Sequence, residues 1–182
     1  MLIVLTGKTA SGKDTVKSIL LKKYPNFKRV ITTTSRTPRF NEKDGVDYHF
    51  LTRKEFENKV KNNDFLEYVE YGGNLYGTQK IELEQTLNQD TLWKIDPSRA
   101  GKIKEMFKNA LVIYINASDD VILQRLKNRN LSETEIQQRM ADDQRIWDQY
   151  KDNYNFIVEN ISGKLDEAVD KITKIIDSNP RG

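Results

Sequence analysis

Leu2-Ile3-Val4-Leu5, followed by Gly7-Lys8-Thr9-Ala10-Ser11-Gly12-Lys13-Asp14-Thr15, is the stretch of sequence that decides the fold. The first four residues are all apolar and predict a short buried strand of a parallel sheet. Gly7, Gly12 and Lys13 have the spacing of a P-loop, in which backbone N–H groups surround phosphate oxygens and the lysine supplies a cation. The following helix presents the positive end of its dipole to the same phosphate. Residues 7–15 therefore predict a site for a nucleoside triphosphate.

The P-loop departs from the general pattern at one position. Asp14 stands where a serine or threonine is expected, and Thr15 comes one place later. We interpret Asp14 as a favourable charge at a helix N-terminus and Thr15 as the hydroxyl that contacts phosphate or metal. A role for Asp14 itself near a magnesium ion is the alternative.

Composition limits the classes of protein that fit. The chain has 182 residues, enough for one domain with a sizeable core. Its 30 basic and 27 acidic residues give a net charge of +3, too small to indicate nucleic acid as the main partner. The absence of cysteine excludes disulfides and thiolate chemistry, and the single histidine, His49, argues against a histidine metal cluster. With no basic, apolar leader and no apolar run of membrane length, we expect a cytoplasmic protein without a membrane partner.

Strand-like and helix-like segments alternate along the chain, the pattern of an α/β protein with a parallel sheet. Ser118 and a Ser132–Glu135 capping box mark the starts of two of the helices. The expected strands are 2–5, 30–32, 91–95, 110–115 and 156–158, and the expected helices include 119–127, 133 to about 150, and 164–176.

Two segments interrupt this alternation. Residues 33 to about 79 contain short aromatic-rich strands around a helix that Thr52 and Glu55 could cap, and we interpret them as an inserted substrate-binding lobe. Residues 124–148 are rich in arginine and poor in apolar anchors, as expected of a mobile cationic lid. The core would then comprise about 1–32, 80–123 and 149–182 of a single domain, with a disordered tail at 179–182.

The inserted lobe carries the most specific strings of the sequence. They are Thr32-Thr33-Thr34-Ser35-Arg36-Thr37-Pro38-Arg39, Asp44-Gly45-Val46-Asp47-Tyr48-His49-Phe50, Phe65-Leu66-Glu67-Tyr68 and Gly73-Asn74-Leu75-Tyr76-Gly77-Thr78. Together with the P-loop, and in this order, they resemble the guanylate kinase family over essentially the whole chain. The resemblance implies a three-layer P-loop kinase core with a parallel sheet, an inserted lobe that binds the nucleoside monophosphate, and a helical lid. It also implies ATP-dependent phosphorylation of GMP, and of dGMP, with Mg²⁺, by a monomer or homodimer.

The resemblance assigns the acceptor site to the lobe. Arg36 and Arg39 would clamp the GMP phosphate between two guanidinium groups, which suit a dianionic phosphate. Guanine presents N1–H and N2 amino donors, so its pocket requires acceptors, and Glu67 matches the family's carboxylate there. The further positions implied for GMP are Thr32, Glu42, Tyr48, Tyr76, Thr78 and Asp96.

Phosphoryl transfer requires positioning and charge neutralisation rather than a general base, because the acceptor phosphate is already a nucleophile. The resemblance gives the catalytic cations as Lys13, Arg36, Arg125, Arg129 and Arg139. Gly7, Lys8, Thr9, Ala10, Ser11, Gly12, Lys13, Asp14 and Thr15 would bind ATP, while Thr15 and Asp96 would hold Mg²⁺.

Lys94 is the main departure from the family, which usually has an acidic residue at this position. From the sequence alone, Lys94→Asp would leave the fold intact and raise the activity or the affinity for Mg²⁺. The following Pro97-Ser98-Arg99-Ala100 also differs and is similar to the related ribose 1,5-bisphosphate phosphokinases, which are one alternative. A non-catalytic guanylate kinase-like binding module is the other, although its usual loss of P-loop residues is not found here.

Overall fold

A central parallel sheet forms the core of the computed structural model, which describes residues 1–86, 88–129 and 131–179. Hydrogen-bonded neighbours in the sheet are parallel throughout. In spatial order its strands are β2 (Lys28–Arg29), β7 (Thr91–Lys94), β1 (Leu2–Gly7), β8 (Leu111–Asn116) and β9 (Phe156–Glu159). The chain passes to opposite sides of β1, so the carboxyl end of β1 lies at the switch point where α/β sheets bind ligands.

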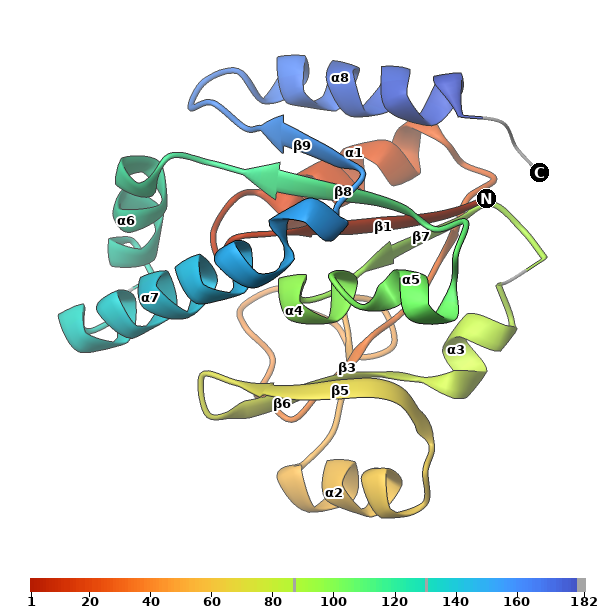
Figure 1. Cartoon of the computed structure of the whole chain (residues 1–182). Coiled ribbons are helices and arrows are strands. Elements are labelled where there is room, and N and C mark those ends of the chain that lie inside the picture. The colour runs from red at the N-terminus through yellow and green to blue at the C-terminus, as the bar shows by residue number, and fades with distance from the viewer. Residues whose placement is uncertain (87, 130, 180–182) are drawn as a thin grey trace.

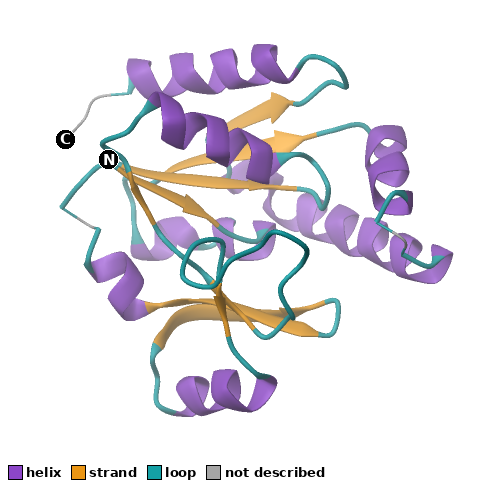
Figure 2. Cartoon of the chain, turned by 180° about the vertical axis from the view of Figure 1, so that it is seen from behind, coloured by secondary structure: helices purple, strands orange, loops and turns teal. Residues whose placement is uncertain are grey.

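Helices cover both faces of this sheet, because successive side chains of each strand point to opposite sides. Ile3 and Leu5 pack with α1 (Lys13–Lys23) and α8 (Leu165–Ser178) on one face. Val4 and Trp93 pack on the other face, which α4 (Pro97–Ala100), α5 (Ile103–Met106) and the end of α7 (Glu133–Tyr150) cover. Figures 1 and 2 show the three layers from the two sides.

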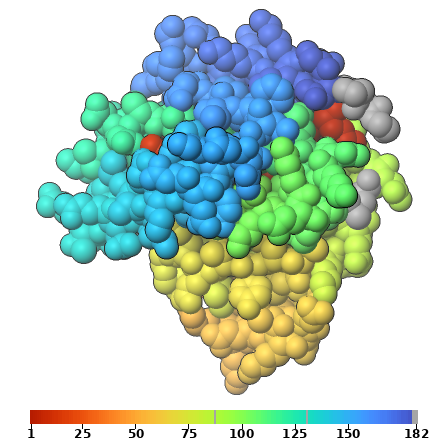
Figure 3. Space-filling model, viewed as in Figure 1, coloured from red at the N-terminus to blue at the C-terminus, as the bar shows by residue number. Residues whose placement is uncertain are grey.

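A second, smaller sheet lies beside the core. Its strand order is β4 (His49–Phe50), β3 (Thr33–Thr34), β6 (Asn74–Gln79) and β5 (Phe65–Tyr71), with β3 and β4 parallel and the other pairs antiparallel. Phe56 of α2 (Arg53–Lys61) packs on Phe65 and Leu75 of this sheet. The capping box of Thr52 and Glu55 at the start of α2 is confirmed. We call residues 33–79, which contain these strands and α2, the lobe, and it projects from the core in Figure 3.

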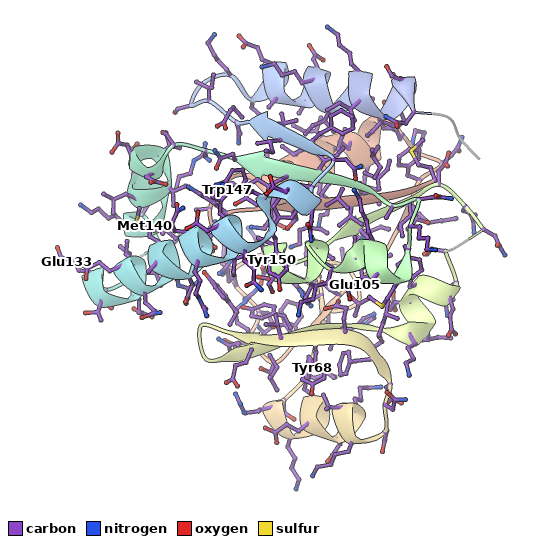
Figure 4. The ribbon with its side chains drawn as sticks, in the orientation of Figure 1. Tyr68, Glu105, Glu133, Met140, Trp147 and Tyr150 are labelled. Atoms are coloured by element: carbon purple, nitrogen blue, oxygen red, sulfur yellow. The ribbon has the colours of Figure 1, made fainter. Side chains whose placement is uncertain are left out.

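The remaining elements connect the two sheets and complete the core. Helix α7 begins at the Ser132–Glu135 capping box, as predicted. Tyr150 and Trp147 lie near its end (Figure 4), where Tyr150 packs next to Gly101 after α4, and the Trp147 ring lies tilted against Tyr114 of β8 with the two ring centroids 4.9 Å apart. The other elements are α3 (Lys80–Glu84), α6 (Asp119–Lys127) and the 3₁₀ helix η1 (Lys151–Asn153). In the described part of the chain, no helix combines the length and apolarity that crossing a membrane requires.

One predicted strand is wrong. Residues 30–32 join two strands instead of forming one, since β2 ends at Arg29 and β3 begins at Thr33. The chain leaves the core sheet here: the Val30 N–H still bonds to the Leu92 carbonyl of the core, while the Thr32 carbonyl already accepts from His49 in the lobe. The other predicted strands, and the helices with stated ends, agree within two residues. Residues 180–182 of the predicted disordered tail lie outside the described residues.

Candidate active site

A cavity of about 570 Å³ opens at the carboxyl end of β1, between the core, the lobe, and helices α6 and α7. This volume is within the range of small-molecule sites. Seven basic and three acidic side chains line it, so its charge favours an anionic ligand. The basic residues are Lys13, Arg39, Lys94, Arg99, Arg125, Arg129 and Arg139, and the acidic ones are Asp14, Asp96 and Asp143.

The P-loop forms one wall of the cavity. Gly12 has φ 93°, a conformation that favours glycine, and a β-carbon there would lie 2.4 Å from the Asn160 side chain. Lys13 Nζ donates to the Lys8 carbonyl at 3.0 Å, which folds the lysine over the loop. Of the residues predicted to bind ATP, seven line the cavity: Gly7, Thr9, Ala10, Gly12, Lys13, Asp14 and Thr15. Lys8 instead pairs with Asp119 at 2.8 Å, and Ser11 is fully buried.

Helices α6 and α7 form a second wall. Arg125, Arg129 and Arg139 all line the cavity, as expected if they act on one ligand. Burial lowers the pKa of Arg129 from its ordinary value, and the nearby charge of Arg39 lowers it further. Arginines that face one another with few carboxylates between them are stabilised when an anion enters, so this wall can hold negative charge.

Asp143 of α7 approaches the P-loop directly. Its carboxylate accepts a hydrogen bond from the Thr9 backbone N–H at 2.7 Å, and the side chain is 5% exposed. Burial raises the pKa of Asp143 above its ordinary value, against the charge of Lys13. Tyr71, near the tip of the β5–β6 hairpin, adds a 2.8 Å hydrogen bond to the Thr9 hydroxyl. Core, lobe and α7 therefore meet at Thr9.

The lobe forms the third wall. Arg39, Tyr48 and Tyr76 line the cavity together with Thr32, so the structure brings these four predicted acceptor residues to one place. Arg36 lies behind them, where Glu42 holds its guanidinium at 2.9 Å and where it faces the Tyr48 ring at 5.6 Å.

The two remaining acceptor residues of the lobe are also set back from the cavity. Thr78 is fully buried, and its hydroxyl accepts a 3.1 Å hydrogen bond from Trp93 Nε1. Glu67 forms an ion pair with Arg99, whose Nη1 is 2.7 Å from Glu67 Oε2. Neither Glu67 nor Thr78 is among the lining residues, whereas Arg99 is. Arg99 therefore stands next to the carboxylate that is predicted to bind guanine.

Lys94 and Asp14, the two departures from the expected pattern, form an ion pair. Lys94 Nζ is 2.7 Å from Asp14 Oδ1 and donates a second 2.7 Å hydrogen bond to Tyr48 Oη. Desolvation acts to lower the pKa of Lys94, but the charge of Asp14 and the contact with Tyr48 outweigh it and raise the pKa. Asp14 responds in the opposite sense: desolvation acts to raise its pKa, and Lys94 and Lys13 hold it below the ordinary value. Both groups are therefore charged at neutral pH.

The charges of Asp14 and Lys94 also affect Lys13, the lysine of the P-loop. Burial lowers the pKa of Lys13 below its usual range, against the charge of Asp14, and Lys94 adds to the decrease. A bound polyphosphate would reverse this effect, because negative charge near an ammonium favours its protonated form.

Oxygen ligands for a magnesium ion are present at the foot of the P-loop. Thr15 and Asp96 line the cavity, and both hydrogen bonds that Asp96 accepts from Ser98 reach the same oxygen, Oδ1, at 2.9 and 2.6 Å. The described residues hold no group of three side chains that could bind a metal unaided. This set fits Mg²⁺, which is usually held by one or two carboxylates together with waters and substrate phosphates.

Several residues of the cavity are not apparent from the P-loop or the lobe strings. Asp143, Tyr71 and Arg99 belong to this group, and each lies in a segment whose sequence also suits an ordinary exposed element. Of these three residues, only Arg99 could have been suspected from the sequence, because it lies in the stretch 97–100 that departs from the family pattern.

A parallel sheet with a P-loop after its central strand, facing a second cation-rich wall across one cavity, defines a P-loop phosphotransferase. A guanylate kinase family model matches residues 1–179. A guanylate kinase from Rickettsia bellii is 38% identical over 97% of this chain and 93% of its own length. One from Fusobacterium nucleatum subsp. nucleatum is 33% identical over 97% and 96%. The crystal structure of guanylate kinase from Anaplasma phagocytophilum superposes with a TM-score of 0.75 at 26% identity, covering 98% of this chain and 85% of that one. The chain belongs to the guanylate kinase family.

Proposed function

We propose that the protein is a guanylate kinase that transfers the γ-phosphoryl group of ATP to the phosphate of GMP, giving ADP and GDP. The observation that carries this proposal is that the P-loop forms one wall of the cavity while Arg39, Tyr48 and Tyr76 of the lobe line another. A donor and an acceptor phosphate would meet between these walls. Family membership over residues 1–179 supports the same substrates.

The residues would act by positioning phosphates and neutralising their charge. Lys13 would move from the Lys8 carbonyl to the donor phosphates. Arg39, Tyr48 and Tyr76 would orient the acceptor phosphate, and Arg36 would join them once the phosphate competes with Glu42. The acceptor oxygen attacks without a general base, consistent with a cavity without lining histidine.

Closure of a lid would complete the site. We expect residues 124–148 to move against the core (about 1–32, 80–123 and 149–182) and the lobe (about 33–79). Arg125, Arg129 and Arg139 would then surround the transferred group and exclude water, which strengthens their electrostatic effect. Mg²⁺, held by Thr15 and Asp96 together with ATP, would add positive charge at the donor phosphates. We expect this reaction to serve purine nucleotide metabolism in the cytoplasm.

A coupled assay with ATP and Mg²⁺ tests the proposal against GMP, dGMP, AMP, UMP, CMP and ribose 1,5-bisphosphate. We expect turnover with GMP and dGMP, and a loss of about 10²- to 10³-fold in kcat for Lys13→Ala. Lys22→Ala, at an exposed position of the same helix, is the matched control and should leave the rate unchanged. Consumption of the sugar phosphate alone would replace the proposal with a ribose bisphosphate kinase. Absence of both ATP and GMP binding by calorimetry would indicate a binding module.

A further inference from the structure

Arg99 and Glu67 form a buried pair at the edge of the cavity. Arg99 belongs to α4, which packs against β5, the strand that carries Glu67. Their side chains are 10% and 11% exposed, and Arg99 Nη1 lies 2.7 Å from Glu67 Oε2. Since Arg99 lines the cavity and Glu67 does not, a ligand in this part of the cavity contacts Arg99 as it approaches the carboxylate.

This pair keeps hydrogen-bonding capacity that the described residues do not use. Oε1 of Glu67 and Nε of Arg99 are buried without a hydrogen-bond partner, while Nη1 and Oε2 contact each other at 2.7 Å in the ion pair. Buried polar groups are almost always hydrogen-bonded, so the unsatisfied atoms of this pair, of which only Arg99 lines the cavity, indicate a ligand that enters from the cavity. The ligand must supply donors to the carboxylate and acceptors to the guanidinium.

The Watson–Crick edge of guanine has this pattern. It presents N1–H and the N2 amino group as donors beside O6 as an acceptor. Adenine presents the reverse, with an amino donor at position 6 and an unprotonated N1, so it would face Arg99 with a donor and Glu67 with an acceptor. The ion pair also suits a neutral base. Without Arg99, the buried Glu67 carboxylate would face the base as an uncompensated charge.

Other polar groups near the pair discriminate less. Thr78 is tied to Trp93 and is not among the lining residues. Thr32 lines the cavity, but a hydroxyl both donates and accepts and therefore suits either base. A guanidinium only donates. We propose that Arg99 is a specificity-determining residue of the acceptor site, which donates to O6 of guanine while Glu67 accepts from N1 and N2; this rests on the proposed function.

Analogues that change one edge atom at a time test the assignment. In 6-thioguanosine monophosphate a weakly accepting sulfur replaces O6, and IMP lacks the N2 amino group. We expect the wild type to prefer GMP over the thio analogue by about tenfold or more in kcat/KM, because hydrogen bonds to charged groups are worth about that factor. In Arg99→Met this preference should fall to within about twofold, while the preference for GMP over IMP, which reports on Glu67, should persist. Arg99→Lys, which keeps the charge, should recover part of the O6 preference.

The outcomes separate this assignment from the proposed function. Dissociation constants for the same three nucleotides, from calorimetry on the full chain, give the ratios even if no nucleotide is phosphorylated. Thermal melting identifies any variant that fails to fold, in which case Arg99→Lys carries the test. An unchanged preference for GMP over the thio analogue in a folded Arg99→Met variant would overturn the assignment. An equal loss of both preferences would also overturn it, because Arg99 would then only support Glu67.

Discussion

Asp14 and Lys94 are each unusual residues for their positions, and together they form one compensated unit. Lys94 is 9% exposed and Asp14 is 63% exposed, so the lysine depends on the pair more than the aspartate does. Taken alone, Lys94 suggested that an aspartate there would raise activity. The 2.7 Å contact with Asp14 reverses that expectation, because Lys94→Asp would place two carboxylates together.

We therefore expect Lys94→Asp to lower the free energy of unfolding by about 2 kcal/mol and to reduce turnover. Removing one partner of a fully buried pair costs about 3–5 kcal/mol, and the exposure of Asp14 reduces this figure. Urea unfolding and the coupled GMP assay measure the two effects. The double variant Asp14→Thr with Lys94→Asp restores the general P-loop pattern and should recover most of both losses. A double variant whose losses equal the sum of those in Asp14→Thr and Lys94→Asp alone would show that the two positions are independent.

Helix α7 places an anionic group where ATP phosphates would bind. The Asp143 carboxylate occupies the Thr9 N–H at 2.7 Å, so a phosphate that uses this donor must displace it. We expect Asp143→Asn to lower the Kd for ATP about three- to tenfold, since an amide is a weaker competitor than a carboxylate. Asp142→Asn, the neighbour that pairs with Arg145 instead, is the control. Weaker ATP binding by Asp143→Asn in calorimetry would mean that Asp143 holds the loop in its binding conformation.

The contact between α4 and α7 tolerates only a glycine at position 101. A β-carbon on Gly101 would lie 2.4 Å from the Tyr150 ring, while its φ of −63° suits any residue. Gly→Ala at such a backbone position normally stabilises by about 0.4–1 kcal/mol, but overpacking costs about 1–3 kcal/mol. We expect Gly101→Ala to lower the melting temperature by several degrees. In a Tyr150→Gly background, which also removes the Tyr150 β-carbon that would lie 2.6 Å away, the same change should cost less than in the wild type, and an equal loss there would place the cause elsewhere.

The elements that sequence predicts well are those with a local signal. The capping boxes of α2 and α7 and the apolar runs of β1 and β8 each depend on residues that are close in the chain. The strand predicted at 30–32 failed because the apolar Val30 belongs to the core while the next residues belong to the lobe, and no local pattern marks that change of sheet. Within the site, the P-loop and the lobe strings are local signals. The pairs Asp14–Lys94 and Glu67–Arg99 join positions far apart in the chain, so only the structure reveals them.

The charge of the whole molecule is small, but it is unevenly distributed. The chain carries a net charge of +3, and seven cationic side chains converge on one cavity. Burial lowers the pKa values of Lys13, Arg129 and the neighbouring Lys17, and the repulsion between nearby cations lowers them further when no phosphate is bound. A bound nucleotide relieves this repulsion. The same buried cations therefore increase the affinity for phosphate and lower the stability of the nucleotide-free protein.

The free-energy cost of burying the charge of Lys17 can be measured as a pH dependence of the free energy of unfolding. It is 8% exposed, and burial lowers its pKa from 10.5 to about 8, with Lys94 and Arg29 lowering it and Asp14 and Asp47 opposing them. Below pH 8 the lysine is protonated in both the folded and the unfolded state, and burial of its charge lowers the free energy of unfolding by the full amount. Between about pH 8 and 10.5 the unfolded state binds more protons, so the free energy of unfolding rises with pH.

We therefore expect Lys17→Met to stabilise the nucleotide-free protein at pH 7 by about 2–3 kcal/mol, because one pKa unit corresponds to about 1.4 kcal/mol. The advantage over the wild type should shrink as the pH approaches 10, since the wild type loses its buried charge there. Urea unfolding at several pH values measures both curves, and Lys22→Met, at an exposed position of the same helix, should leave the pH dependence unchanged. A constant difference between Lys17→Met and the wild type from pH 7 to 10 would attribute the gain to packing rather than to the charge of Lys17.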